Sequence, residues 1–206
     1  PSVDILERIN CAFYKIASRD LTNIPLLKRL AKTNKPIIIS TGMADELDLD
    51  DAINSLNLGK DKLIIMQCTS EYPCKPENVN LNGMKTLENK YGYIVGLSDH
   101  TSGVIISSVA PAMGANIIEK HITLNRTLKG TDQAGSLEEA GLKKLIEYIR
   151  TIELAMGDGI IEFNSDVLSS KIKLARSLTS KVKIKKNQIL TEDMVCLKSP
   201  GDGLLW

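Results

Sequence analysis

The sequence predicts an α/β fold built on a parallel sheet, because two kinds of segment alternate along it. Short runs rich in Ile and Val recur up to His121, and each is followed by a segment with helical periodicity. Such runs suit strands that are buried on both faces, and this regular succession indicates right-handed crossovers between parallel strands. We expect strands at 13–17, 36–40, 63–68, 93–97 and 116–121, and helices at 25–33, 47–56, 80–90, 103–113 and 137–156.

Two architectures have this alternation of strands and helices, an open doubly wound sheet and a (β/α)8 barrel. An open sheet would normally carry a Gly-rich phosphate loop after a strand, but neither GxGxxG nor GxxxxGK[ST] occurs. Polar residues instead follow all five runs, and catalytic groups collected from several strand ends are typical of the barrel. The sequence therefore predicts the C-terminal five βα units of a (β/α)8 TIM barrel, with about three further strands before Pro1.

The composition changes after the last predicted helix, which divides the chain. Gly157 and Gly159 are expected to end that helix, since glycine tolerates the left-handed conformation of a helix stop. Residues 160–172 show little periodicity, whereas 177–184 alternates like an exposed strand and 190–195 suggests a capped turn before another strand. We expect a partial barrel domain at 1–158, a linker at 159–174 and part of a small β-rich domain at 175–206.

The overall composition is that of an ordinary globular protein, with 43% hydrophobic and 25% charged residues among 206. A net charge of +1 gives no reason to expect nucleic acid as a partner. No segment has the roughly 18 apolar residues that cross a bilayer, and no secretion signal is visible, so we expect a soluble cytoplasmic protein without a membrane partner. The four cysteines lack CxxC spacing and are interpreted as reduced thiols, with Cys68 in the core.

The only two histidines, His100 and His121, follow successive predicted strands. An imidazole at the carboxyl end of a buried strand is well placed to bind a metal or to carry a proton. One such histidine is more often a plain surface or core residue, but the pair makes a metal site an equally good interpretation. The neighbouring carboxylates Asp99 and Glu119 are interpreted as partners that orient the two rings.

Eight short motifs occur together and in order along the chain. They are KIAS at 15–18, DLTN at 20–23, STGM at 40–43, CTSEYP at 68–73, GLSDHT at 96–101, IEKH at 118–121, GTD at 130–132 and SLE at 136–138. This set resembles the sialic acid synthases, the N-acetylneuraminate synthase family that includes the legionaminate and pseudaminate synthases. The resemblance covers essentially the whole chain, and KSPGDG at 198–203 continues it into the antifreeze-like (SAF) domain of those enzymes.

The resemblance implies an activity and a set of site residues. The family condenses phosphoenolpyruvate with an N-acetylated amino sugar, N-acetylmannosamine or a relative, to give a nine-carbon 2-keto sugar acid and phosphate. His100 and His121 match the ligands of a divalent metal, Mn²⁺ or Mg²⁺, a role that suits neutral imidazoles. Positions that hold phosphoenolpyruvate match Lys15, Ser40, Ser70 and Ser98, and positions that contact the sugar and move protons match Asp20, Tyr72 and Asp132.

Three of these positions depart from the family pattern. Some members have Asn in place of Ser70, and both side chains can donate a hydrogen bond. Some have Glu in place of Asp20, which reaches one methylene further. Many have Pro in place of Thr131, so this sequence has a looser turn before Asp132.

The resemblance also implies that this chain holds only part of a site. In the family, further residues come from an amino-terminal part of the barrel and from the second half of the antifreeze-like domain, which acts across a domain-swapped homodimer. We therefore expect the isolated 206-residue chain to be inactive or nearly so. Two alternatives are another metal-dependent TIM-barrel aldolase or keto-acid synthase, and a non-catalytic half-barrel binding protein.

Overall fold

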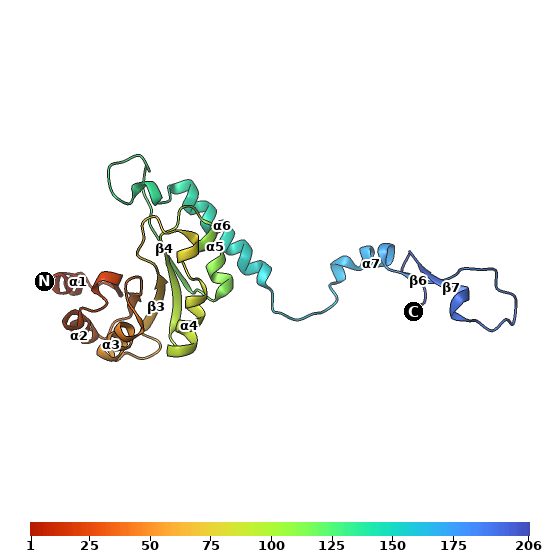
Figure 1. The fold of residues 1–206 in the computed structure, drawn as a ribbon, viewed down its shortest axis with the longest axis horizontal. Helices are drawn as coiled ribbons and strands as arrows, with labels where there is room; N and C mark the ends of the chain where they lie inside the picture. The colour runs from red at the N-terminus through yellow and green to blue at the C-terminus, as the bar shows by residue number, and fades with distance from the viewer. The chain divides into compact units, whose positions relative to one another are not determined.

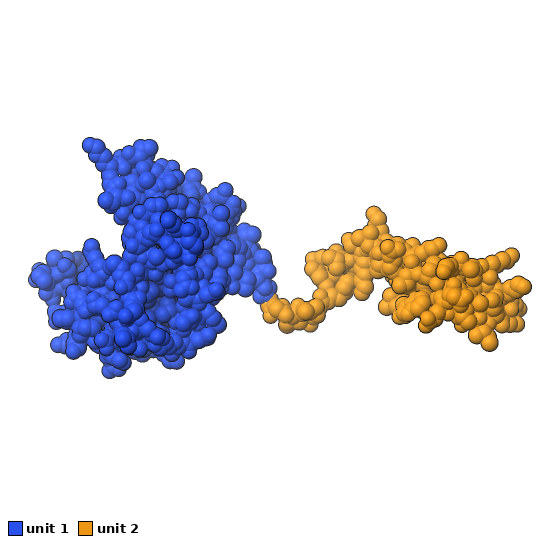
Figure 2. Space-filling model, viewed as in Figure 1, with its two compact units in different colours: residues 1–157 blue, residues 158–206 orange.

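The protein is described by a computed structural model that covers all 206 residues. The chain forms two compact units, residues 1–157 and residues 158–206, which are described separately (Figure 2). No helix is both long enough and apolar enough to cross a membrane.

The first unit alternates strands and helices in the predicted order (Figure 1). The strands are β1 (Tyr14–Ile16), β2 (Ile37–Ser40), β3 (Leu63–Cys68), β4 (Ile94–Asp99) and β5 (Ile117–Lys120). The α-helices are α1 (Ser2–Arg8), α2 (Ile24–Ala31), α3 (Glu46–Leu56), α4 (Asn82–Tyr91), α5 (Ile105–Val109) and α6 (Glu139–Met156). Short 3-10 helices are η1 (Ser18–Asp20), η2 (Pro76–Asn78), η3 (Ala110–Met113) and η4 (Gln133–Gly135).

The five strands form one parallel sheet in sequence order, with β1 and β5 at its edges. This confirms the predicted strands and their parallel arrangement, and the sheet is a five-stranded half-barrel. The carboxyl ends of all five strands lie at the same end of the sheet, because every pair of neighbouring strands is parallel. The polar residues that end the strands are thereby brought to one end of the sheet.

Local signals in the sequence account for the ends of the helices. Asp45 and Asp48 form a reciprocal capping box at the start of α3, and Asn57 ends that helix in the left-handed conformation. Gly157 ends α6 with a positive φ of 59°, which confirms the predicted helix stop. The helix predicted at 103–113 is divided into α5 and η3, at the step where Pro111 lacks the amide hydrogen that a continuing helix needs.

The two faces of the sheet differ in burial, because side chains alternate along each strand. One face carries Ile37, Ile39, Leu63, Ile65 and Leu97, all with no exposed surface, and it forms the core together with the apolar sides of α2, α3 and α4. The opposite face is only partly buried along its amino-terminal half. The strands were expected to be buried on both faces, and this is wrong for the amino-terminal half of the face opposite the core.

The second unit is small and largely exposed. It contains η5 (Ser165–Val167), α7 (Leu168–Leu174), β6 (Ser177–Ser180), η6 (Glu192–Met194) and β7 (Val195–Lys198), and β6 pairs with β7 in antiparallel fashion. The two strands and the turn before β7 were expected. Helix α7 was not expected; it has only seven residues, too few for a clear helical period, and all of them are exposed. The assignment of this unit to an antifreeze-like domain stays a prediction.

Candidate active site at the carboxyl ends of the strands

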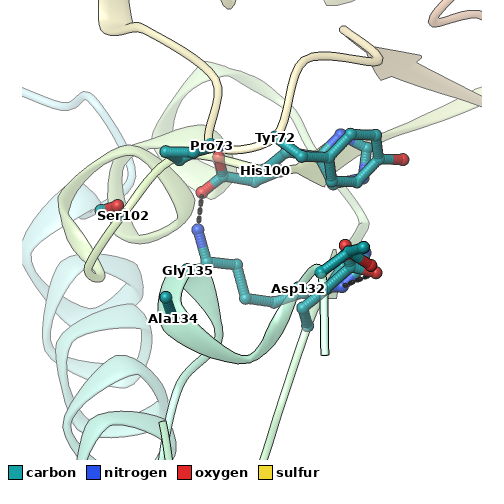
Figure 3. Close-up of a pocket in the computed structure, with 11 residues that line it drawn as sticks. Tyr72, Pro73, His100, Ser102, Asp132, Ala134 and Gly135 are labelled. Carbon is teal, nitrogen blue, oxygen red and sulfur yellow. Dashed lines mark hydrogen bonds and ion pairs between the residues drawn. The ribbon is translucent and has the colours of Figure 1, made fainter. Parts of the chain in front are cut away.

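A small cavity lies beyond the carboxyl ends of β4 and β5, with a volume of about 120 Å³ (Figure 3). Its wall consists of Tyr72, Pro73, Asp99, His100, Ser102, Lys120, His121, Thr131, Asp132, Ala134 and Gly135. Four residues assigned to the site from the sequence therefore meet here, although 60 positions separate Tyr72 from Asp132 in the chain. The space is smaller than the roughly 300–1,000 Å³ of typical ligand pockets, which suits a cation and a few oxygen atoms.

Three aromatic rings cluster at this cavity. The His100 and His121 rings are 5.2 Å apart between centroids and stand nearly perpendicular, at 87°. The Tyr72 ring lies 4.1 Å from His100 and 5.6 Å from His121, and Figure 3 shows it beside His100. The two imidazoles are thus close enough to approach one small ion.

The orientation of His100 is set by one hydrogen bond of its ring and one of its backbone. Its Nδ1 lies 2.8 Å from the carbonyl oxygen of Thr69, which can only accept, so Nδ1 carries the hydrogen and Nε2 keeps its lone pair. The carbonyl of His100 accepts a hydrogen bond from the amide of Cys74 at 2.9 Å. Burial lowers the pKa of His100, but hydrogen bonds to Cys68 and Thr69 raise it, and the net direction is upward.

Cys68 is a hydrogen-bond partner of this ring. The residue is buried, as expected, and its thiol has Ser18 as a hydrogen-bond partner at 3.6 Å. Burial raises the pKa of the Cys68 thiol, but hydrogen bonds with His100 and Ser18 outweigh burial, and the net direction of the pKa is downward.

His121 and Asp132 face each other across the cavity. Asp132 Oδ2 is 3.6 Å from Nδ1 of His121, and both side chains are partly exposed, at 47% and 36%. The distance exceeds that of a hydrogen bond, so the contact is ionic only when the imidazole is protonated. Asp132 therefore lies next to His121 and is partly open to solvent.

The donor set agrees in kind with a Mn²⁺ or Mg²⁺ site but is not complete. No group of three or more His, Cys, Asp or Glu side chains in the structure could hold a metal by itself. Two imidazoles can supply two ligands, and an octahedral cation would take its others from water and from substrate oxygens. The residues fit a metal that is shared with its substrate.

A second cluster spans the sheet from one edge to the other. Lys15 Nζ on β1 donates to Ser40 Oγ on β2 at 2.7 Å and lies 3.4 Å from Glu119 Oε2 on β5. Ser98 Oγ on β4 donates to Glu119 Oε1 at 2.9 Å. A contact between the two edge strands requires a strongly curved sheet. Three of the four predicted phosphoenolpyruvate residues therefore lie in one cluster with Glu119, in which Lys15 and Ser98 contact Glu119 and Ser40 contacts Lys15.

This cluster corrects the interpretation of one neighbouring carboxylate, Glu119. Glu119 contacts Lys15 and Ser98 and does not orient a histidine ring. Asp99 has no direct hydrogen bond to an imidazole, but its Oδ1 accepts from the backbone amide of Thr101, next to His100. The sequence contained one signal for Glu119, a charged residue that follows two isoleucines in a strand.

Two predicted site residues lie outside both clusters. Asp20 belongs to η1, and its ionic partner is the exposed Arg19 at 3.6 Å. It does not cap the following helix, since Asn23 accepts from Leu26 N at that position. Ser70 lies beside Gly42, and its amide donates to the carbonyl of Gly42 at 3.1 Å.

Gly42 is enclosed by side chains from two other strand ends. A Cβ at this position would lie 2.5 Å from Ser70 Oγ, 2.8 Å from Cys68 Sγ and 2.9 Å from Ser18 Oγ. The amide of Gly42 also donates to Ser18 Oγ at 3.0 Å. Only a residue without a side chain permits these hydroxyls to approach the backbone so closely.

Gly42→Ala is therefore expected to displace the hydroxyls of Ser18 and Ser70. On the phosphoenolpyruvate role that the resemblance implies for Ser70, the variant is expected to weaken phosphoenolpyruvate binding about tenfold, which equals the loss of about one hydrogen bond. Isothermal titration with phosphoenolpyruvate measures this. Gly141→Ala in α6 is the control, because its new methyl group would meet only the flexible Leu137 side chain, at 3.3 Å. Equal affinities for the two variants would contradict the role of Gly42.

Comparison with known proteins decides the family. The model of the NeuB family matches residues 1–161, which include both clusters. The chain belongs to the NeuB family. This confirms the resemblance found in the sequence.

Relatives within the NeuB family are similar over nearly the whole chain. The N,N'-diacetyllegionaminic acid synthase of Campylobacter jejuni is 40% identical over 206 residues, which cover 98% of this chain and 62% of the relative. The pseudaminic acid synthase of Helicobacter pylori is 37% identical over 204 residues, covering 98% and 60%. This chain thus spans about three fifths of the length of these relatives.

A solved structure supports the same assignment. The N-acetylneuraminic acid (sialic acid) synthetase of Leptospira borgpetersenii, in complex with citrate, superposes with a TM-score of 0.75 at 35% identity. The match covers 82% of this chain and 60% of that protein. The half-barrel sheet therefore matches part of the fold of this synthetase.

Proposed function

We propose that this chain carries the metal site and much of the phosphoenolpyruvate site of a synthase that joins phosphoenolpyruvate to an N-acetylated amino sugar. The product is a nine-carbon 2-keto sugar acid, released with inorganic phosphate. The observation that carries the proposal is the meeting of His100 and His121 in one cavity with Tyr72 and Asp132. The names of the relatives support the same class of reaction.

The Lys15 cluster is the proposed anion site. Phosphoenolpyruvate carries a phosphate and a carboxylate, and a lysine surrounded by hydroxyl donors suits either group. Lys15 and Ser98 now engage the Glu119 carboxylate, so an incoming anion would replace that carboxylate as their partner. Ser40 stays beside Lys15 and would donate to the same anion. Ser70 is proposed as a further donor from the neighbouring strand end.

His100 and His121 would hold the Mn²⁺ or Mg²⁺ ion. When bound, such an ion acts as a Lewis acid toward an aldehyde oxygen and lowers the pKa of bound water. The chain contributes the orientation of the ligands, through the contact from His100 Nδ1 to the Thr69 carbonyl. Tyr72 covers one side of His100, which limits the access of water to that ring.

The proposed reaction balances without an oxidant or reductant. C3 of phosphoenolpyruvate bonds to the aldehyde carbon of the sugar, and the aldehyde oxygen takes up a proton. Water adds to C2 and loses a proton, which leaves a hydroxyl group there. The C2–O bond to phosphate then breaks, the hydroxyl proton is transferred to the leaving phosphate, and the 2-keto group forms. Asp132 and Tyr72, which line the cavity, are proposed to contact sugar hydroxyls and to move these protons. Asp20 is proposed for the same task from η1, beyond the end of β1.

The test supplies the part of the site that this chain does not span. A chimera joins the part of the Campylobacter relative outside its match to residues 1–206, and phosphate release from phosphoenolpyruvate is measured with a panel of N-acetylated amino sugars. Release that depends on both the sugar and Mn²⁺ is expected. Lys15→Met in the chimera should lower the rate about 100-fold, as expected for loss of a charged phosphate ligand.

The isolated chain is the control and should release no phosphate. Release without a sugar, or none from a chimera with native circular dichroism, would contradict the proposed reaction. The sugar that gives the highest rate identifies the substrate within the class. We also propose that the full-length protein is a domain-swapped homodimer in the cytoplasm. Sedimentation of the chimera tests whether it is a dimer.

A further inference from the structure

The residues that directly precede the two histidines form a buried ion pair. Lys120 Nζ donates to Asp99 Oδ2 at 2.8 Å, and the side chains are 4% and 0% exposed. Asp99 and Lys120 are also direct partners in the register of β4 and β5. His100 and His121 are therefore the next residues along two strands that this pair joins.

The hydrogen bonds of the pair enclose the backbone around His100. Asp99 Oδ1 accepts from the amide of Thr101 at 2.8 Å, and Lys120 Nζ donates to the carbonyl of Thr101 at 2.5 Å. Both polar groups of the Thr101 backbone are thus held by the pair. Asp99 precedes His100 and Thr101 follows it, so the backbone of the histidine is fixed on both sides.

A helix completes the arrangement. Ser107 on α5 has no exposed surface and donates its hydroxyl to Asp99 Oδ2. Burial raises the pKa of Asp99, but the bonds from Lys120, Ser107 and Thr101 outweigh it and hold the pKa below its ordinary value. The carboxylate is therefore ionised and has three donors.

Stability alone does not explain this pair. A buried ion pair pays the desolvation of both ions, and well-packed apolar residues of similar volume are often as stable. Such a pair instead defines one geometry, since the alternatives leave a buried charge without a partner. Here the geometry defined is the spacing between His100 and His121.

We propose that Asp99 and Lys120 are positioning residues, which set the relative placement of the two imidazoles and thereby the affinity for the metal. This inference rests on the proposed function, because it takes His100 and His121 as the metal ligands. Neither residue needs to touch the metal, since each acts through the backbone of the adjacent histidine.

The experiment uses the 206-residue chain and two measurements. Mn²⁺ affinity is obtained from electron paramagnetic resonance titration, and the Cε1–Hε1 resonances of the only two histidines report ring placement without metal. In Lys120→Met and Asp99→Asn, we expect both histidine resonances to move and Mn²⁺ affinity to fall about 10- to 100-fold, the range for residues that orient metal ligands. Lys143→Met is the matched control, because it breaks an exposed pair with Glu139 on α6.

A milder variant keeps the test decisive if the buried charge left by these changes prevents folding. Ser107→Ala removes one of three donors to Asp99 and leaves both charges in place, and a 3- to 10-fold loss of affinity is expected, about the effect of one hydrogen bond. Unchanged histidine resonances and an affinity within twofold of the parent in Ser107→Ala would overturn the proposal. Failure of the parent chain to bind Mn²⁺ would overturn the metal site itself, while the resonances would still decide whether the pair positions the rings.

Discussion

Replacing His100 or His121 by Ala is expected to weaken Mn²⁺ binding to the chain by at least about 100-fold, equal to about 2.7 kcal/mol. The effect is large because the chain supplies two imidazoles and no third His, Cys, Asp or Glu side chain that could complete a metal site with them. Removing one leaves a single protein ligand, which binds a hydrated ion no better than a surface histidine does. Electron paramagnetic resonance of free Mn²⁺ measures the difference directly.

The control for this experiment removes another group that can bind metals. Cys196→Ala takes a thiol from the second unit and should leave the affinity unchanged. Equal weakening by Cys196→Ala would place the metal elsewhere. Retention of the parent affinity by both histidine variants would remove the metal from the proposed function.

Leu97→Ala is expected to lower the free energy of unfolding by about 2–5 kcal/mol. Leu97 has no exposed surface and lies in the core on β4, the strand that leads to Ser98 and His100. The substitution leaves a cavity between the sheet and the helices that the rigid neighbours can only partly fill. A single domain is stable by about 5–15 kcal/mol, so the loss is a large part of the total.

Denaturation by urea, followed by circular dichroism, measures this loss. The control is Ile94→Ala on the same strand, because Ile94 is 41% exposed and does not belong to the core. Its expected cost is below about 1 kcal/mol. Similar midpoints for the two variants would show that β4 does not pack as the structure describes.

Much of the half-barrel could be predicted because its signals are local. Runs such as Ile37 to Ile39 are apolar, β-branched and bounded by turns, and β3 begins and ends at the predicted residues. Helix ends followed from short-range chemistry, as at Gly157, where a positive φ favours glycine. Helix α7 gave no such signal, since its seven residues are too few for a clear helical period.

The site was predictable only in part. Residues at strand ends were expected to meet, since parallel strands end at one edge, and Tyr72, His100, His121 and Asp132 do line one cavity. The partner of each side chain could not be predicted from the sequence. Glu119 lies opposite Ser98 in the register of β4 and β5, and Asp99 lies opposite Lys120. These two pairs are consecutive, so they face opposite sides of the sheet and belong to different clusters.

The sequence by itself determined the alternation of strands and helices, the family motifs and the kinds of side chain at the strand ends. It did so because hydrophobic period and turn chemistry act within a few residues. Only the tertiary structure decided that Lys15 meets Glu119 across the sheet and that Asp99 and Lys120 are buried together beside the histidines. Those contacts depend on the curvature of the sheet and the register of β4 with β5, which arise when the whole half-barrel packs against its helices.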